Sequence, residues 1–415
     1  MELELCAYAP SDWEIKSIVD VCQRVTSGGT PSRRVPAYYE GGIWPWVKTQ
    51  ELQNGWIDDT EEHITGDAVF ASSAKVLPTD TILVAMYGAT VGQLGILRRP
   101  MTCNQACCAL ITDPSKADFR FLFFQLLQIR EELKSLATGA AQQNLSGVLI
   151  KNLRLPFPPI EEQRAIAHIL GTLDDKIELN RRRNQTLEAM ARALFKDWFV
   201  DFGPVRAKLE NREPYLPADL WQLFPDRLDD EGKPEGWGTE RVSKYLSLAY
   251  GKSLPAAKRL PGNTPVYGSG GITGFHNEAL VNEQTVIVGR KGTVGSLYWE
   301  DRPCFPIDTV FFVRPAAPLP FCYYLLEDLP LRNMNTDAAV PGLNRDNVYR
   351  LEVAAPPPEL VSDFAKTASC YRESIAAISK ESETLAQVRD TLLPKLISGE
   401  LRIADAEQFL KERAL

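Results

Sequence analysis

The sequence predicts an α+β protein built from two tandem α/β domains, each followed by a long helix. The two helices are expected to pack as an antiparallel coiled coil about a pseudo-two-fold axis. Three observations predict this architecture. A long amphipathic stretch begins near residue 158, a similar stretch begins 198 residues later, and the segments before both stretches share a glycine-rich motif. Repetition at this spacing indicates an internal duplication.

Residues 1–157 are predicted to form the first domain. The turn-rich segment SGGTPSRR leads to WPWVKTQEL, a short aromatic and β-rich run. Apolar alternation resumes after a glycine turn in TILVAMYGATVGQLGIL, which predicts a hairpin. Residues 119–137 have the apolar spacing of one amphipathic helix, and a glycine- and glutamine-rich loop follows them.

Residues 158–203 are predicted to form the first long helix. From Ile166 to Trp198, apolar residues recur at alternating steps of four and three, and Asn180 and Asn184 occupy two positions of this seam. At about 1.5 Å per residue, the helix would be about 60 Å long. Since this exceeds the usual globular length, the helix is expected to act as a spacer or a partner surface. The two asparagines could fix its register.

The second half of the chain repeats this plan. Residues 204–236 are rich in proline and charge and are predicted to be an ordered linker. Residues 237–355 form the predicted second domain, in which the motif Thr-Val-Gly recurs 203 residues after its first copy, while the loops differ. Residues 356–415 contain the second long helix and a tail. Arg389 alone interrupts the seam of this helix.

Composition restricts the possible functions. The chain has 415 residues, 44% of them hydrophobic, so it can form true cores. Its net charge of −8 argues against a surface that attracts nucleic acid everywhere, although local basic patches are compatible with it. The eight cysteines form no CxxC pair and the three histidines lie far apart, so we expect no metal site. No apolar run has the length of a membrane span, and no signal peptide is evident, which predicts a cytoplasmic protein without a membrane partner.

The duplication by itself leaves two functions open. Two similar heads at a fixed separation suit duplex DNA, and heads with different loops would recognise two different half-sites. A structural scaffold whose two heads bind other proteins explains the same pattern equally well.

Four segments resemble one known family. PFPPIEEQRAIAHILGTLDDKIELN and LEAMARALFKDWFVDFGPVRAK resemble the central conserved region of the specificity subunits of Type I restriction-modification systems. LFPDRL with PEGW and ETLAQVRDTLLPKLISGELRI resemble two further regions of that family, in the same order. The resemblance implies two target recognition domains that each bind one half of a bipartite, asymmetric DNA site. It also implies that the helices set the spacer and dock two methyltransferase subunits, and that motor-nuclease subunits join them for defence against foreign DNA. A related methyltransferase without the motor is an alternative setting.

No catalytic or cofactor motif is evident in this chain. It lacks the Asn/Asp-Pro-Pro-Tyr/Phe tetrapeptide of amino-methyltransferases, and the GKS at Gly251 lacks the earlier glycine of a phosphate-binding loop. We therefore expect a non-catalytic subunit that binds no cofactor. The resemblance implies that the methyltransferase partners bind S-adenosylmethionine and methylate adenine at N6, and that the motor-nuclease partners use ATP and Mg.

The side-chain types of some loop residues indicate candidate DNA contacts. Arginine and amide side chains pair with base edges, whereas lysine and threonine more often position phosphates. A solvated surface charge or a turn-forming role explains any single candidate about as well. In the first domain the candidates are Arg33, Arg34, Lys48, Thr49, Gln50, Tyr87, Thr90, Gln142, Gln143 and Asn144. In the second domain they are Lys258, Arg259, Tyr267, Ser269, Arg290, Lys291, Asn344 and Arg345.

Overall fold

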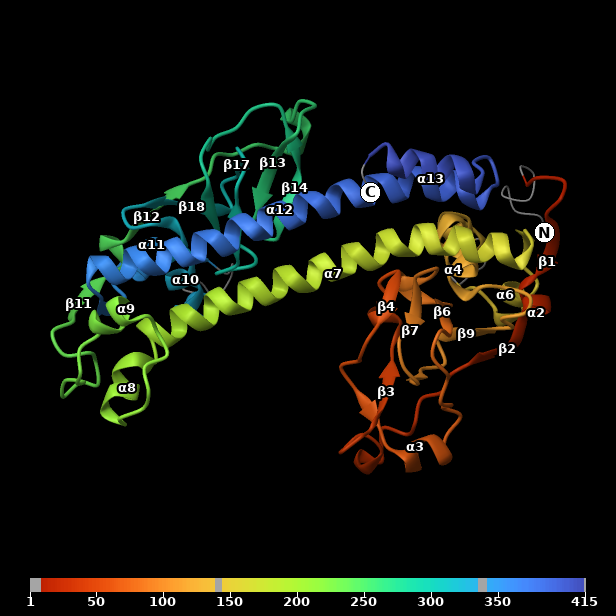
Figure 1. The fold of residues 1–415 in the computed structure, drawn as a ribbon, viewed down its shortest axis with the longest axis horizontal. Coiled ribbons are helices and arrows are strands. Elements are labelled where there is room, and N and C mark those ends of the chain that lie inside the picture. Colours follow the sequence, from red (N-terminus) through yellow and green to blue (C-terminus); the bar gives the residue numbers. More distant parts are fainter. Residues whose placement is uncertain (1–8, 139–143, 335–341, 414–415) are drawn as a thin grey trace. The chain divides into compact units, whose positions relative to one another are not determined.

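The computed structural model describes residues 9–138, 144–334 and 342–413 of the chain (Figure 1). The chain divides into two compact units. Unit 1 consists of Met1–Glu178 and Ser382–Leu415, and unit 2 consists of Leu179–Glu381. The boundaries fall within the two long helices, α7 (Ile160–Phe199) and α12 (Pro358–Ile397), so each helix contributes to both units.

Unit 1 combines three sheets with helices. The strands are β1 (Glu14–Ser17), β2 (Cys22–Ser27), β3 (Trp44–Val47), β4 (Gly55–Ile57), β5 (His63–Ile64), β6 (Ile82–Ala85), β7 (Leu94–Leu97), β8 (Thr102–Cys103), β9 (Cys107–Thr112) and β10 (Arg154–Phe157). The helices are α2 (Ile18–Val21), α3 (Gly66–Phe70), α4 (Phe119–Gln128), α5 (Arg130–Thr138), α6 (Gly147–Lys151) and α13 (Ile403–Lys411), together with its parts of α7 and α12.

Local sequence explains these elements, with one correction. The glycine turn produces an antiparallel β6–β7 hairpin in which Ile82 faces Ile96. The single helix predicted for residues 119–137 is wrong, because two helices, α4 and α5, meet at Ile129. Ile129 is 1% exposed, so its side chain is committed to the core at the point where the helix breaks. Asp118 caps α4 by accepting from the Arg120 and Phe121 amides.

Unit 2 has a similar set of elements. The strands are β11 (Gly238–Arg241), β12 (Leu246–Tyr250), β13 (Thr264–Gly268), β14 (Gly271–His276), β15 (Thr285–Gly289), β16 (Leu297–Glu300), β17 (Phe305–Pro306), β18 (Val310–Pro315) and β19 (Glu352–Ala355). The helices are α8 (Gly203–Leu209), α9 (Ala218–Gln222), α10 (Leu319–Asp328) and α11 (Arg345–Tyr349), together with its parts of α7 and α12. Helices α8 and α9 lie in the segment predicted to be an ordered linker.

The two units share one strand topology. Strands β2-β9-β6-β7 of unit 1 follow the same order as β12-β18-β15-β16 of unit 2, and β5-β3-β8 match β14-β13-β17. The pairs β1–β10 and β11–β19 also correspond. Equivalent loops are tied by equivalent bonds: the Leu145 amide donates to the Met86 carbonyl at 2.7 Å, and the Leu343 amide to the Arg290 carbonyl at 2.8 Å. Strand β4 extends the larger sheet of unit 1. The predicted α+β duplication is thus confirmed in the topology.

The long helices close the core of each unit. In unit 1, Ile166 and Leu170 of α7 share an apolar cluster with Leu392 and Leu396 of α12. Helix α4 lies beside this part of α7 (Figure 1), and an ion pair of 2.9 Å joins Arg120 Nη1 to the carboxylate of Asp175. Along the whole of α7, five of the ten predicted seam positions are buried apolar residues. They are Ile166, Leu170, Leu173, Ala191 and Trp198.

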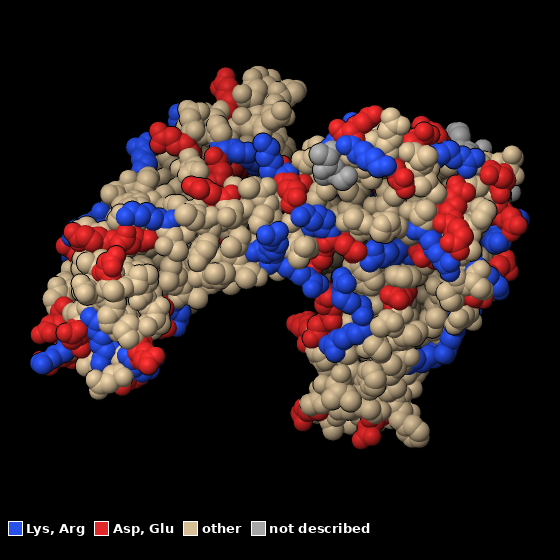
Figure 2. Space-filling view, viewed as in Figure 1, with Lys and Arg blue, Asp and Glu red and all other residues tan. Residues whose placement is uncertain are grey.

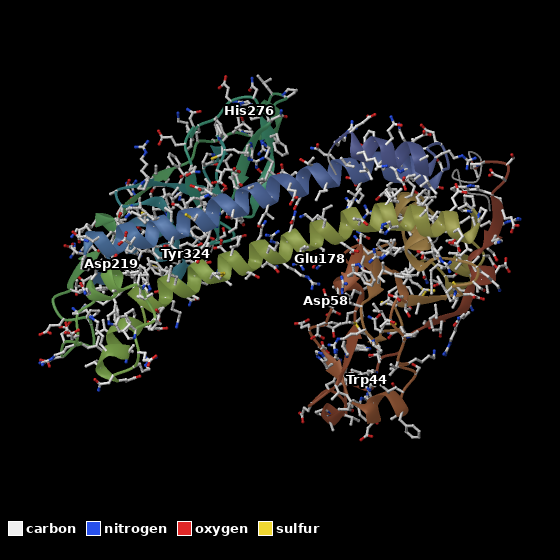
Figure 3. The ribbon with its side chains drawn as sticks, in the orientation of Figure 1. Trp44, Asp58, Glu178, Asp219, His276 and Tyr324 are labelled. Carbon is white, nitrogen blue, oxygen red and sulfur yellow. The ribbon has the colours of Figure 1, made fainter. Side chains whose placement is uncertain are left out.

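In unit 2 the helices pack on an aromatic cluster. The Phe364 ring of α12 contacts Phe195 and Phe199 of α7 at centroid distances of 5.5 and 5.4 Å. Tyr324 of α10 lies 5.8 Å from the same ring. Figure 3 labels Tyr324 close to the helices, whereas His276 lies on the outer hairpin of the unit. The sheets of unit 2 are therefore anchored to the helices through α10.

Polar side chains join α7 to α12 in antiparallel order. In unit 2, Asn180 Nδ2 donates to Glu381 at 2.6 Å, and Asn184 Nδ2 donates to the Ser379 hydroxyl at 3.0 Å. As residue numbers rise along one helix they fall along the other, which confirms the predicted antiparallel packing. Asn180 is fully buried, so its hydrogen bond favours this pairing over shifted ones.

Arg389 does not interrupt the helix pair in the way that the seam pattern suggested. In unit 1 its guanidinium lies 2.7 Å from Asp174 of α7. Burial raises the pKa of the Asp174 carboxyl, and the bond to Arg389 only partly offsets this effect. Arginine fits the seam because a carboxylate faces it.

None of the helices in the described part of the chain is long and apolar enough to cross a membrane.

Candidate nucleic-acid interface

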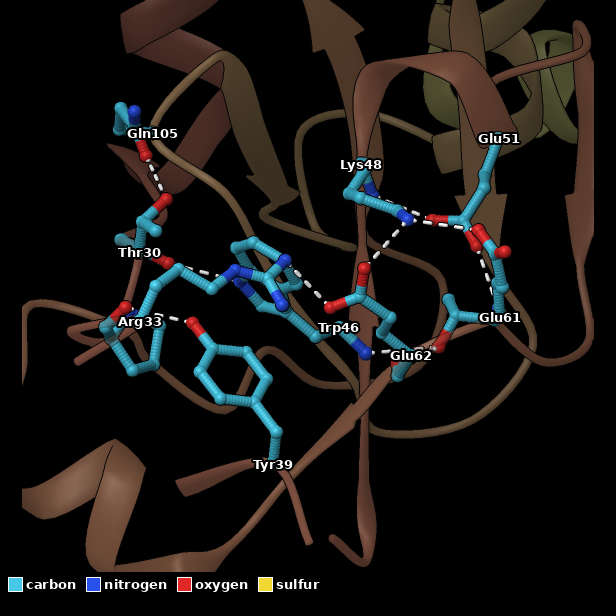
Figure 4. Close-up of polar contacts among 12 residues, drawn as sticks. Thr30, Arg33, Tyr39, Trp46, Lys48, Glu51, Glu61, Glu62 and Gln105 are labelled. Carbon is cyan, nitrogen blue, oxygen red and sulfur yellow. Dashed lines mark hydrogen bonds and ion pairs between the residues drawn. The ribbon is translucent and has the colours of Figure 1, made fainter. Parts of the chain in front are cut away.

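One polar cluster of unit 1 is organised around the carboxylate of Glu62 (Figure 4). Strand β3 positions it, because the Trp46 amide donates to the Glu62 carbonyl at 2.9 Å. The Arg33 guanidinium lies 2.6 Å from the Glu62 carboxylate. It also lies 4.2 Å from the ring centroid of Tyr39 and 5.1 Å from that of Trp46. Two aromatic rings and one charge thus hold Arg33 in place.

Lys48 shares the same carboxylate. Its ammonium group lies 3.1 Å from Glu62 and 2.9 Å from Glu61, and its amide donates to Glu51 at 2.7 Å. Burial raises the pKa of Glu62, but hydrogen bonds and charge from Lys48 and Arg33 outweigh it and leave the pKa below its ordinary value. The bonds to Glu61 and Glu62 raise the pKa of Lys48. Both shifts favour the charged forms of Glu62 and Lys48, and the carboxylates largely neutralise the two cations.

A second group of unit 1 candidates lies around Gln105. The Tyr87 hydroxyl donates to the Gln105 carbonyl at 2.8 Å, and the Thr30 hydroxyl donates to the Gln105 side chain. Tyr87 also forms an antiparallel backbone bridge with Asn144. The Trp46 indole donates to the Gly29 carbonyl at 3.0 Å, which links this group to the Glu62 cluster through the Gly29–Thr30 loop.

The other unit 1 candidates have different environments. Arg34 and Gln50 are exposed, and Thr90 is half-buried. Thr49 is 7% exposed, so its side chain belongs to the packing of the unit. Gln142 and Gln143 lie outside the described residues.

Two unit 2 candidates meet at a tyrosine that sequence reasoning did not select. The guanidinium carbons of Arg290 and Arg345 each lie over the ring of Tyr250, 4.9 Å from its centroid. Tyr250 is 48% exposed and packs edge-on against Phe311 with centroids 4.9 Å apart. Asn344 caps α11 by accepting from the Asp346 amide at 2.8 Å, which fixes Arg345 as the first residue of that helix.

The remaining unit 2 candidates are more scattered. Arg259 donates to the Thr273 carbonyl at 2.7 Å, and Lys258 and Lys291 are exposed. Tyr267 is 6% exposed, and its hydroxyl donates to Glu300 at 2.8 Å, so this side chain supports the sheet. The half-buried residue Ser269 accepts a hydrogen bond through its carbonyl from Ser296 at 2.6 Å.

Sequence reasoning therefore found most of the cations of both clusters and missed the groups that hold them. Tyr39, Trp46, Glu62, Gln105 and Tyr250 were not selected. An aromatic residue five positions after the paired arginines was a usable signal for Tyr39, whereas Trp46 lies twelve positions after them. Glu62 could not be found in this way, because only the β3–β5 pairing brings it to Arg33.

Charge of both signs covers the molecule. On the visible face in Figure 2, Lys and Arg side chains are interspersed with Asp and Glu over both units. Among the described residues, no group of three or more His, Cys, Asp or Glu side chains is placed to hold a metal ion. The two clusters are thus local arrangements of cations with aromatic rings rather than parts of one broad basic surface.

Comparison with known proteins finds similarity to one family of proteins. Residues 10–189 match the profile of the Type I restriction modification DNA specificity domain. The chain is 28% identical to the type I restriction enzyme MjaIX specificity subunit of Methanocaldococcus jannaschii, over 95% of each protein. It is 27% identical to the type I restriction enzyme HindI specificity subunit of Haemophilus influenzae, over 61% of this chain and 70% of the relative.

A solved structure supports the fold over the whole chain. The crystal structure of a type I restriction-modification S subunit from M. genitalium superposes with a TM-score of 0.58, at 21% identity, over 92% of this chain and 96% of that chain. The sequence matches extend this likeness beyond the fold. Residues 10–189 match a DNA specificity domain, and over 95% of its length the chain is similar to a type I restriction enzyme specificity subunit.

Proposed function

We propose that this chain reads a bipartite, asymmetric DNA site, with unit 1 recognising one half and unit 2 the other. The observation that carries the proposal is the contrast between scaffold and surface. The two units have the same strand order, but their exposed clusters contain different side chains. Equal scaffolds suit equal placement on a repeating duplex, and different surfaces suit different base sequences.

We further propose that the long helices set the spacing and dock two methyltransferase subunits. A groove of about 670 Å³ on the unit 2 part of the helices supports docking. It is lined by apolar residues that include Leu179, Leu187 and Ile378, with Arg183 at its side. Leu179 is 50% exposed, so an apolar side chain of the groove is open to a partner.

In the proposed complex the chemistry belongs to the partners. The methyltransferase subunits would bind S-adenosylmethionine and methylate adenine at N6 after flipping it from the duplex. Motor-nuclease subunits would use ATP and Mg. This chain would supply recognition without catalysis, and the complex would act on DNA in the cytoplasm.

The decisive experiment is a genome-wide map of N6-methyladenine. Cells that carry this chain with its cognate methyltransferase subunit are compared with cells that carry the methyltransferase alone. We expect a split, asymmetric motif only when both proteins are present. A stable and active complex that produces no new motif would remove the reading function and favour a protein-binding scaffold.

The same map separates the two halves. Replacing the exposed residues of unit 1 by those of a relative should change one half-site and leave the other half-site and the spacer intact. Copurification with or without a motor-nuclease subunit distinguishes a restriction complex from a motor-free methyltransferase.

A further inference from the structure

The Tyr250 stack of unit 2 consists of two arginine side chains at one exposed tyrosine ring. Arg290 and Arg345 both lie 4.9 Å from the centroid of one exposed ring. Repulsion between the two guanidinium groups opposes this arrangement, and the electron-rich ring face offsets only part of it. A site built in this way gains most when an anion binds between or beside the two groups.

Few acidic groups neutralise these cations. Arg290 donates to a neutral acceptor, the Asp308 carbonyl, at 2.9 Å. Arg345 lies 3.8 Å from the Asp346 carboxylate, a long and exposed contact. Two further cations, Lys252 and Arg314, are exposed and line the adjacent groove. The stack therefore keeps most of its positive charge, in contrast to the Glu62 cluster of unit 1.

The fold does not require the stack, because unit 1 has the same backbone without it. Tyr250 is paired with Phe311 in the sheet, and at the equivalent position Ser27 is paired with Cys108. Met86 stands in the place of Arg290, as the equivalent bonds to Leu145 and Leu343 show. Gly147 begins α6 where Arg345 begins α11. All the groups of the stack are absent from unit 1, so their presence in unit 2 points to a ligand of that unit alone.

An open groove begins at the stack. It has a volume of about 800 Å³ and is lined by Tyr250, Arg345, Lys252, Arg314 and Tyr349, with Glu283 as the only acidic residue of its lining. Three cations against one acid give the groove a positive potential. The groove follows the edge strand β12 and its neighbour β18, and such an open, elongated shape suits an extended anion better than a small enclosed one.

We propose that the Tyr250 stack and its groove bind the phosphate backbone of the DNA beside the half-site that unit 2 reads. This inference rests on the proposed function and adds to it the separation of phosphate contacts from base contacts among the residues of unit 2. Arg290 and Arg345 position one DNA strand through its phosphates, and Tyr250 holds both guanidiniums in the required orientation. Base selection in unit 2 is left to other side chains, and unit 1 uses no equivalent contact.

The test uses the assembled methyltransferase complex and a duplex that carries its mapped recognition site. Arg345→Gln removes one phosphate contact while keeping a polar side chain. We expect weaker binding to all sequences, an unchanged methylation motif and a salt slope that is shallower by about one unit. The affinity loss should therefore shrink about fourfold between 50 and 200 mM salt.

A matched control is available next to the same helix. Arg350→Gln removes the same charge from the exposed end of α11, away from the stack and groove. It should change the salt slope by much less. Equal slope changes in the two variants would show a general charge effect and overturn the proposal.

Chemical deletion of phosphates locates the contact. Methylphosphonates replace single phosphates at and around the unit 2 half-site, and each modified duplex is tested with the native and Arg345→Gln complexes. At one or two modified phosphates, the affinity loss from the methylphosphonate and the loss from Arg345→Gln should not add, because each change removes the same contact. Full additivity at every position, with specific binding by the native complex intact, would refute the phosphate site and leave the proposed function standing. Absence of specific binding by the native complex would instead refute the proposed function.

Discussion

Each unit brings an arginine to the same pair of strands, but a different partner holds it. In unit 1 the Glu62 carboxylate holds Arg33 beside β3. In unit 2 the position of Glu62 is taken by Gly274, which is paired with Val266 of β13, and Arg259 instead donates to the carbonyl of Thr273 at 2.7 Å. A carboxylate cancels the charge that it positions, whereas a carbonyl positions an arginine and leaves its charge intact.

The difference shows how one scaffold can serve two kinds of contact. Unit 1 neutralises Arg33 and Lys48 with acids, so its cluster offers directed hydrogen bonds with little net charge. Unit 2 keeps the charge of Arg259 and of the Tyr250 stack. If the chain binds DNA as proposed, cations that acids do not neutralise, such as Arg259 and the Tyr250 stack, would provide local positive charge in spite of the net charge of −8.

The contacts between α7 and α12 also differ between the units. Each unit joins an arginine of α12 to an acid of α7: Arg389 to Asp174 in unit 1 and Arg372 to Glu188 in unit 2. Only Arg372 also lies over aromatic rings, 4.5 Å from Trp299 and 5.4 Å from Tyr323.

The largest expected effect tests this helix contrast. Arg372→Leu should lower the free energy of unfolding by about 3 kcal/mol, because it leaves the half-buried Glu188 with only the 4.0 Å contact to Arg192. Arg389→Leu should cost about 1–2 kcal/mol, since that pair is more exposed and Asp174 already has a raised pKa. Chemical unfolding of the full chain gives the totals, and hydrogen exchange of helix peptides assigns each loss to a unit. Equal losses in the two variants would show that the two helix contacts stabilise their units to the same extent.

The next effect concerns the glycine that replaces the unit 1 carboxylate. Gly274 has a φ of +144°, and a Cβ there would lie 2.7 Å from Arg259 Nη1. Gly274→Ala should therefore destabilise unit 2 by about 1–3 kcal/mol. Gly270→Ala is the control, because a Cβ there meets no atom within 4 Å. A stable Gly274→Ala variant would mean that the glycine is not required for the carbonyl-held arginine.

A smaller effect is expected when unit 1 is made to resemble unit 2. Glu62→Gln removes the shared carboxylate charge and frees Arg33 and Lys48 to meet phosphates. DNA affinity of the methyltransferase complex should rise by about two- to tenfold at moderate salt, with a steeper salt slope. Glu40→Gln makes the same charge change at an exposed residue of the same unit and should have a weaker effect. Identical gains would show that only net charge matters.

The smallest effect is a pH dependence in unit 1. The folded pKa of Glu62 lies below its ordinary value of 4.5, so its ion pairs stabilise the unit fully above that value. This contribution is lost as the pH falls through the lower folded pKa. The stability difference between the native chain and Glu62→Gln should accordingly shrink as the pH is lowered from about 6 to about 3. A difference that grows on acidification would contradict the assigned shift.

The sequence was informative wherever one residue pattern determines one structure. The seam from Ile166 to Trp198 predicted α7, and the offset of the Thr-Val-Gly motif predicted the shared topology. It was less informative where partners come from distant segments. Arg389 looked like a defect until Asp174 was found opposite it, and the role of Glu62 depends on a strand pairing that no local pattern specifies. The domain boundaries and the DNA contacts chosen from the sequence stay predictions.

The composition of unit 1 from two separate segments has a consequence for how the protein is made. Trp13 near the start of the chain shares an apolar cluster with Leu392, Leu396 and Ile397. Gly399 is pressed against Pro10 and Trp13, where no larger residue would fit. Unit 2 is continuous and is synthesised before residues 382–415. The first segment of unit 1 must therefore wait, partly unprotected, while the second unit folds, so the unit that is synthesised first is the last to be completed.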